Sequence, residues 1–171
     1  ARLPGDRVGV MLPASVGADV VFLALLFAGK VPVMVNWTTG PRLVRHGLDV
    51  AGVRAVLTAR ALVDRLAAQG FERAAVEERL VYLEDLVHAL GLGAKLRAAA
   101  MARLRPRTLV RADVPETAVV LFTSGSEALP KAVPLSHANL LANLRDIGRR
   151  VAFVPGDSLL SVLPPFHSFG L

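Results

Sequence analysis

Short apolar runs alternate with helix-like stretches along the first part of the chain. Apolar runs bounded by Gly or Pro are typical of buried strands, and stretches with a capping residue in front and a glycine behind are typical of helices. Ser15 and Pro41 mark two helix starts, and Gly29 and Gly70 mark two helix ends. The predicted strands are 7–12, 31–35 and 54–58, the predicted helices are 15–28, 41–52 and 61–69, and 36–40 is a predicted loop.

The rest of the chain continues this alternation less regularly. Ser136 is placed to cap a helix, and alanine content predicts another helix in the middle of the chain. Strands that alternate with helices at this spacing pair in parallel, so the fold class is α/β, with a mostly parallel sheet flanked by helices. The further predicted strands are 80–83, 118–122, 132–135 and 158–163, and the further predicted helices are 94–104 and 137–149.

Composition and charge exclude several classes of protein. A chain of 171 residues that is 53% apolar and 20% charged is too apolar for a disordered protein. It contains no cysteine, so disulfide scaffolds, thiolate zinc sites and cysteine nucleophiles are excluded. The longest uncharged apolar run, 20–29, is shorter than the roughly 20 residues of a membrane span. The net charge is +6, but few aromatic residues lie among the basic ones, so we expect no nucleic-acid partner.

A hydroxyl-rich loop follows the apolar strand 118–122. It begins at Thr123 and ends at Lys131, with Gly125 between them. Hydroxyl and backbone N–H donors in a tight loop can hold phosphate oxygens, and a lysine adds a mobile positive charge. Pro130 and Ala132 stand where a Walker A loop needs Gly and Ser or Thr, so this is not that motif. The residues by themselves are equally compatible with a polar loop joining two strands.

The loop and a later segment resemble motifs of a known superfamily. Residues 121–133, followed by Ser136 and His137, resemble the phosphate-binding signature of the adenylate-forming enzymes, and 163–170 resembles their second motif. A finer resemblance is to the acyl-acyl-carrier-protein synthetase part of bifunctional 2-acylglycerophosphoethanolamine acyltransferases. It is carried by 35–40, 81–86 and 122–131. The resemblance covers the chain from about Arg7 onward.

This resemblance implies a reaction and a set of residues. Such enzymes join ATP and a carboxylate into an acyl-adenylate and then pass the acyl group to a thiol. The implied carboxylate is a long-chain fatty acid, and the implied thiol is acyl carrier protein or coenzyme A. His167 would lie beside the carboxylate and adenylate and, with Lys131, is a catalytic candidate. Mg²⁺ would accompany ATP, with its ligands outside these residues. The residues implied to hold the β- and γ-phosphates are Thr123, Ser124, Gly125, Ser126 and Lys131.

Two departures from the family pattern qualify these expectations. Ala128 and Ala132 stand where the family has glycine, and an alanine held at positive φ would cost about 1–2 kcal/mol. The later motifs of the family do not follow 163–170. We therefore expect 1–171 to be part of an N-terminal adenylation domain that is inactive alone. We expect it in the cytoplasm, with a peripheral position at the inner membrane if it binds lipid.

Other interpretations remain open at this point. The chain could be a non-catalytic nucleotide- or phosphate-binding module. It could also be a basic interaction domain, because the segment from Lys95 to Arg111 holds no acidic residue. On an amphipathic helix this segment could contact anionic lipid or an acidic carrier protein, and otherwise it is a solvated face. His137 at a helix start is expected to cap or pack, and Trp37 to pack beside a turn rather than line an acyl pocket.

Overall fold

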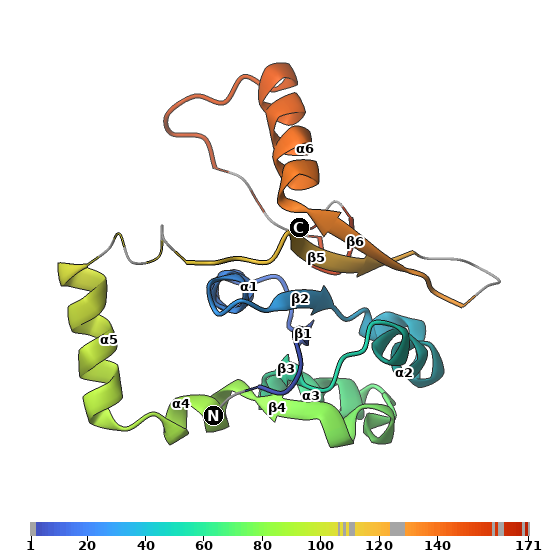
Figure 1. Ribbon diagram of the computed structural model, residues 1–171. Coiled ribbons are helices and arrows are strands. Elements are labelled where there is room, and N and C mark those ends of the chain that lie inside the picture. The colour runs from blue at the N-terminus through green and yellow to red at the C-terminus, as the bar shows by residue number, and fades with distance from the viewer. Residues whose placement is uncertain are drawn as a thin grey trace.

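The computed structural model describes residues 3–105, 107, 109, 112–123, 129–158, 160, 163–168 and 170. These residues form a six-stranded sheet with the order β4-β3-β1-β2-β5-β6 (Figure 1). Neighbouring strands are parallel except β6, which pairs antiparallel with β5. The predicted α/β fold with a mostly parallel sheet is confirmed. The strands are β1 (Arg7–Met11), β2 (Val31–Met34), β3 (Val56–Thr58), β4 (Leu80–Tyr82), β5 (Thr117–Phe122) and β6 (Ala132–Ser136).

Local sequence signals account for several helix boundaries. The Ser15 side chain accepts a hydrogen bond from the Ala18 N–H at the start of α1, and Ser136 and Asn139 form a capping box at the start of α6. Gly29 follows α1 with φ of 71°, a conformation that glycine adopts readily. The helices are α1 (Val16–Phe27), α2 (Pro41–Val50), α3 (Arg60–Ala68), α4 (Leu83–Ala89), α5 (Leu92–Leu104) and α6 (His137–Arg150), with short 3₁₀ turns η1 (Trp37–Thr39), η2 (Arg73–Ala75) and η3 (Glu77–Arg79).

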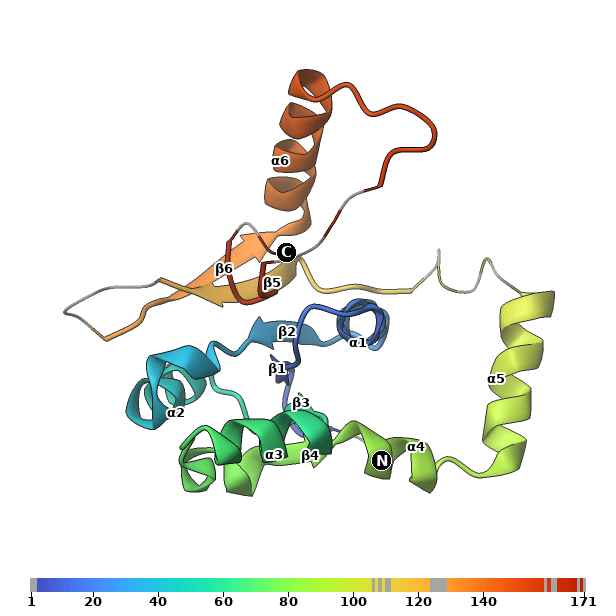
Figure 2. The same ribbon diagram turned by 180° about the vertical axis from the view of Figure 1, so that it is seen from behind.

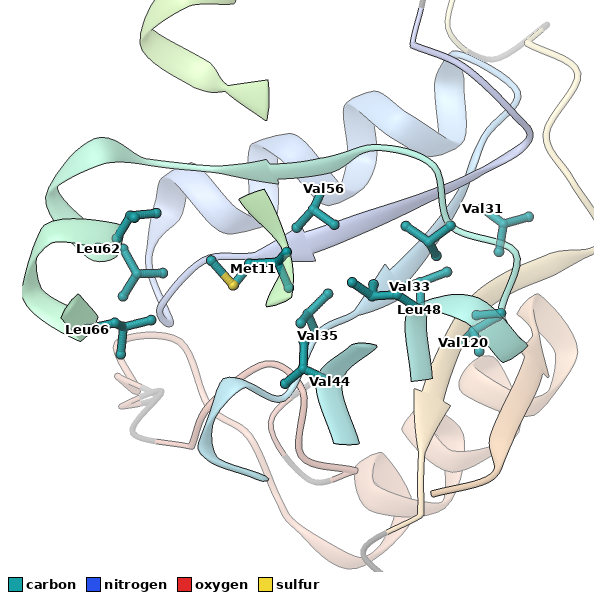
Figure 3. Packing of buried hydrophobic residues seen from close by; sticks show 14 residues of the cluster. Met11, Val31, Val33, Val35, Val44, Leu48, Val56, Leu62, Leu66 and Val120 are labelled. Atoms are coloured by element: carbon teal, nitrogen blue, oxygen red, sulfur yellow. The ribbon is translucent and has the colours of Figure 1, made fainter. Parts of the chain in front are cut away.

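Each face of the sheet carries its own hydrophobic cluster. Because successive side chains of a strand point to opposite faces, Val120 joins one cluster and its neighbours Val119 and Leu121 join the other. The first cluster packs the sheet against α2 and α3, and Figure 3 shows strand side chains meeting Val44 and Leu48 of α2. We call it the α2 cluster. The second packs the other face against α1, α4 and α6, and we call it the α1 cluster.

Two parts of the structure differ from the sequence predictions. The strand 80–83 ends at Tyr82, and an unpredicted helix, α4, begins at Leu83. Glu84 and Asp85 in its first turn favour a helix start, since carboxylates stabilise the positive end of the helix dipole. The predicted strand 158–163 is wrong at its described residues, 158, 160 and 163, none of which lies in a strand. Leu160 is 82% exposed there, so its apolar character reflects no buried sheet position.

α5 lies apart from the main body of the fold, whereas α6 packs on it at its first turn through Leu140. Both views show α6 projecting from the β5–β6 hairpin and α5 standing clear of the sheet on the path from β4 to β5 (Figures 1 and 2). Every residue of α5 is exposed. The compact part of the described chain is therefore the sheet with α1 to α4 and the first turn of α6.

Candidate functional site

A hollow of about 490 Å³ opens where β2 and β5 end. Ligand sites of open α/β sheets lie outside the carboxyl ends of the strands, and this hollow occupies that position. Apolar side chains from β5 and β6 form part of its wall, and polar side chains from three loops form the rest. Its lining residues are Asn36, Leu121, Phe122, Thr123, Val133, Leu135, Phe166, His167 and Ser168.

The hydroxyl-rich loop is closed at its base by paired hydrogen bonds. The Thr123 N–H donates to the Lys131 carbonyl oxygen at 3.1 Å, and the Lys131 N–H donates to Thr123 Oγ1 at 3.2 Å. One step back along the hairpin, Phe122 is the register partner of Ala132. The structure thus brings the predicted site residues Thr123 and Lys131 together at the stem of the loop, where Lys131 is exposed.

Four of the loop positions discussed above cannot be compared with the structure. Ser124, Gly125, Ser126 and Ala128 lie outside the described residues. Their roles in phosphate binding therefore remain predictions.

His167 lies in a turn that borders the same hollow as Thr123. Its N–H donates to the Pro164 carbonyl oxygen at 2.9 Å, and its own carbonyl accepts from the Gly170 N–H at 2.8 Å. A side chain at Gly170 would overlap the Pro164 carbonyl, so the turn requires glycine there. The two resembled motifs, far apart in the sequence, therefore meet at one hollow through Thr123 and His167.

Phe122 lines both this hollow and a smaller one of about 30 Å³ against α2. A methyl group added at the buried Gly47 of α2 would lie 3.2 Å from the ring atoms Cε1 and Cζ of Phe122. The ring therefore packs directly on the α2 backbone. The sequence pattern predicted no role for Gly47, because the partner of a helical glycine is visible only in the folded structure.

Trp37 contacts the second motif, which the sequence did not predict. Its ring lies edge-on to Phe166, with centroids 4.7 Å apart and an interplanar angle of 79°. The expected packing beside a turn is confirmed, since the half-buried Trp37 begins η1 and packs against the α2 cluster. The predicted packing role of His137 is confirmed as well, because its Nε2 lies 3.1 Å from the Pro115 carbonyl oxygen.

A polar cluster at the neighbouring strand ends joins α3 to α4. The Arg60 guanidinium donates to both carboxylate oxygens of Asp85 at 2.6 Å and lies over the Tyr82 ring at 4.2 Å. The hydrogen bond to Asp85 raises the pKa of Arg60 above its usual value. Glu84 accepts the Arg60 backbone N–H at 2.9 Å. Oε2 of Glu84 is buried and accepts no hydrogen bond from the part of the chain that the structure describes. The described residues contain no group of three or more His, Asp or Glu side chains that could hold a metal ion.

The described part of the basic segment 95–111 does not form the amphipathic helix that lipid binding was expected to use. Its helical part lies in α5, where Leu96 and Met101 alternate around the axis with Arg97 and Arg103. Interfacial helices need an apolar face opposite a charged one, and α5 has neither. Within the described part of the chain, no helix is long and apolar enough to cross a bilayer.

Comparison with known proteins gives the family of the chain. The AMP-binding enzyme family matches residues 3–171, so the chain belongs to it. The chain is 30% identical over 181 residues to the acyl-CoA ligase sidI of Beauveria bassiana, an alignment that covers 98% of this chain and 30% of that ligase. It is 27% identical over 169 residues to the medium/long-chain-fatty-acid–CoA ligase FadD6 of Mycobacterium tuberculosis, covering 98% and 27%. The predicted membership of the adenylate-forming superfamily is confirmed.

Solved structures agree on the fold. o-Succinylbenzoate CoA synthetase (MenE) from Bacillus subtilis superposes with a TM-score of 0.73 in its complex with AMP, at 18% identity over 99% of this chain and 39% of that one. The same enzyme in complex with ATP and magnesium ion gives a TM-score of 0.68 at 16% identity, over 99% of this chain and 40% of that one. The chain spans less than a third of the length of the two ligases above.

Proposed function

We propose that this chain is part of a ligase that activates a carboxylate with ATP to an acyl-adenylate and then transfers the acyl group to a thiol. The observation that carries the proposal is the meeting of Thr123 and His167 at one hollow, at the edge of the sheet where α/β proteins bind ligands. Family membership supports the same chemistry. The proposed carboxylate is a long-chain fatty acid, in keeping with the name of the medium/long-chain-fatty-acid–CoA ligase FadD6.

The proposed roles follow from the chemistry of adenylation. A carboxylate is a poor electrophile because its carbon carries no leaving group, and adenylation supplies one. The loop must hold phosphate oxygens while charge develops on them, which suits hydroxyl and N–H donors at Thr123, Ser124, Gly125 and Ser126. Lys131 contributes positive charge at the stem of that loop. His167 meets the carboxylate side of the hollow, so both reactants are held in one place.

Magnesium, when bound, would neutralise charge on the ATP phosphates. The described residues do not fit a magnesium site by themselves, since they contain no cluster of three or more possible ligands. We propose that its ligands belong to another part of the enzyme, and we assign it no step here.

Exposed apolar surfaces support a catalytic unit longer than this chain. α1 exposes a stripe of apolar side chains one helical turn apart, and α6 exposes another. Monomeric proteins rarely leave such stripes open to water. We propose that 1–171 is part of the N-terminal domain of the enzyme and is inactive alone. The stripes comprise Val16, Val20, Leu23 and Phe27 on α1 and Leu141, Leu144 and Ile147 on α6.

The thiol acceptor and the place of reaction are also proposals. We propose acyl carrier protein or coenzyme A as the acceptor, and the cytoplasm as the compartment that supplies them together with ATP. Assaying the complete enzyme with each thiol and one acyl-adenylate distinguishes the two acceptors. A peripheral contact with the inner membrane would have to rest on the charge of 95–111 alone, because α5 lacks an apolar face.

ATP–pyrophosphate exchange in the complete enzyme tests the proposed function. Exchange should require a fatty acid, and Thr123→Ala or Lys131→Ala should reduce its rate about 10²–10³-fold, the loss typical of removing a charge-stabilising donor. Lys95→Ala is the matched control, because Lys95 is an exposed lysine on α5, far along the chain from the loop. ATP binding without exchange would favour the non-catalytic module. Equal effects of the two lysine variants would refute the role of Lys131.

A further inference from the structure

The Trp37–Phe166 contact joins the two hydrophobic clusters at the edge of the sheet that carries the site. Trp37 packs against the α2 cluster, and Phe166 packs against the α1 cluster. Their rings meet edge-to-face at 4.7 Å, a geometry that aromatic pairs favour. We propose that Trp37 is a positioning residue, which holds Phe166 and thereby His167 at the wall of the hollow. This inference rests on the proposed function of the hollow.

Trp37 is itself held firmly in place. Asn36 directly before it accepts two hydrogen bonds through Oδ1, from the Thr38 N–H at 3.0 Å and from the Thr38 hydroxyl at 2.6 Å. The Thr39 hydroxyl donates to the Asn36 carbonyl oxygen at 2.9 Å. These bonds hold η1 together two residues after β2, a strand buried along its whole length. The indole therefore projects from a rigid part of the fold.

Phe166 depends on that support more than a core residue would. It is half-buried, and one side of its ring borders the hollow of about 490 Å³. Removing the indole would leave the ring with open space beside it and one contact fewer. His167 is the next residue, and its backbone is held by the turn bond to Pro164. A shift of Phe166 would thus move His167 relative to Thr123 across the hollow.

Loss of the Trp37 indole should affect the use of the carboxylate more than the use of ATP. His167 lies on the proposed carboxylate side of the hollow, whereas the phosphate loop is tied by its own bonds between Thr123 and Lys131. Loss of the indole should therefore weaken use of the carboxylate much more than use of ATP. A small misplacement of a substrate-positioning group is enough to lower catalysis by an order of magnitude or more.

Three substitutions in the complete enzyme test the inference by ATP–pyrophosphate exchange. Trp37→Leu keeps apolar bulk but removes the ring, and should raise KM for the fatty acid about tenfold while KM for ATP changes less than about twofold. Trp37→Phe keeps an aromatic edge and should stay close to wild type. Phe22→Leu is the matched control. Like Phe166, Phe22 is a half-buried aromatic residue that packs against the α1 cluster, but it lies in helix α1 and not in the loop beside His167.

The outcomes separate this inference from the proposed function. Absence of exchange in the wild-type enzyme refutes the proposed function. If the wild-type enzyme catalyses exchange, two results overturn the positioning role. One is that Trp37→Leu behaves like Trp37→Phe, and the other is that Trp37→Leu raises KM for the fatty acid and KM for ATP equally. The contact has its own readout, the fluorescence of Trp37, which in the complete enzyme is the difference between the spectra with Trp37 and with Trp37→Phe. Phe166→Leu should shift the fluorescence of Trp37 to longer wavelength, and an unchanged spectrum would contradict the contact.

Discussion

Gly9 lies in the middle of β1, which runs between β3 and β2. A methyl group built at its Cα would lie 2.9 Å from Cγ2 of Val56, and 3.3 Å from Cγ2 of Val35 and Cγ1 of Val53. Carbon atoms prefer separations of about 3.5–4.0 Å, so Gly9→Ala would create three overlaps at once. All three valines are at most 2% exposed, which leaves them little room to move.

Two opposing effects decide whether Gly9→Ala raises or lowers the free energy of unfolding. Alanine is favoured over glycine in a strand by about 0.5–1 kcal/mol, because it loses less conformational entropy on folding. Overpacking a filled core costs about 1–3 kcal/mol. Because three contacts lie inside the preferred separation, we expect the cost of overpacking to dominate. Gly9→Ala should then lower the free energy of unfolding by about 1–2 kcal/mol.

Urea denaturation followed by circular dichroism measures this change, and a second substitution tests its cause. Val56→Ala removes the nearest methyl groups, so the penalty of Gly9→Ala should largely disappear in the Val56→Ala background, with a coupling above about 0.5 kcal/mol. Gly148→Ala is the control, because a methyl group at Gly148 of α6 meets nothing within 4 Å. The reasoning is refuted if Gly9→Ala matches or exceeds the wild-type stability, or if its penalty persists unchanged beside Val56→Ala.

Three further predictions concern the helices and the loop. Ser136→Ala removes the capping box of α6 and should lower the free energy of unfolding by about 1 kcal/mol, measured by thermal melts; an unchanged melt would show that α6 unfolds separately. Ala128→Gly restores the residue usual in the family and should lower the Kd for ATP in the complete enzyme, so an equal or higher Kd contradicts the strain argument. Flotation with anionic vesicles should show binding of this chain that disappears at high salt, because α5 offers charge without an apolar face; salt-resistant binding would refute this.

Most elements could be predicted because their signals are local. Ser15, Gly29, Pro41 and Ser136 act within one helical turn, and each marks a boundary that the structure reproduces within two residues. The strand predicted at 158–163 is wrong at its described residues, because an apolar run becomes a strand only beside a partner strand that accepts its hydrogen bonds. α4 was missed because its apolar residues, such as Leu86, acquire a helical face only by packing on the α1 cluster.

The amino-acid sequence by itself determined the family, the α/β class and the candidate residues Thr123, Lys131 and His167, since motifs and strand spacing are linear properties of a chain. The folded structure was needed to show that Thr123 and His167 border one hollow and that Trp37 contacts Phe166. The physical reason is that these properties depend on the crossover connections, which bring the ends of β2 and β5 to one edge of the sheet. Contacts between segments far apart in the sequence leave no periodic signal in either segment.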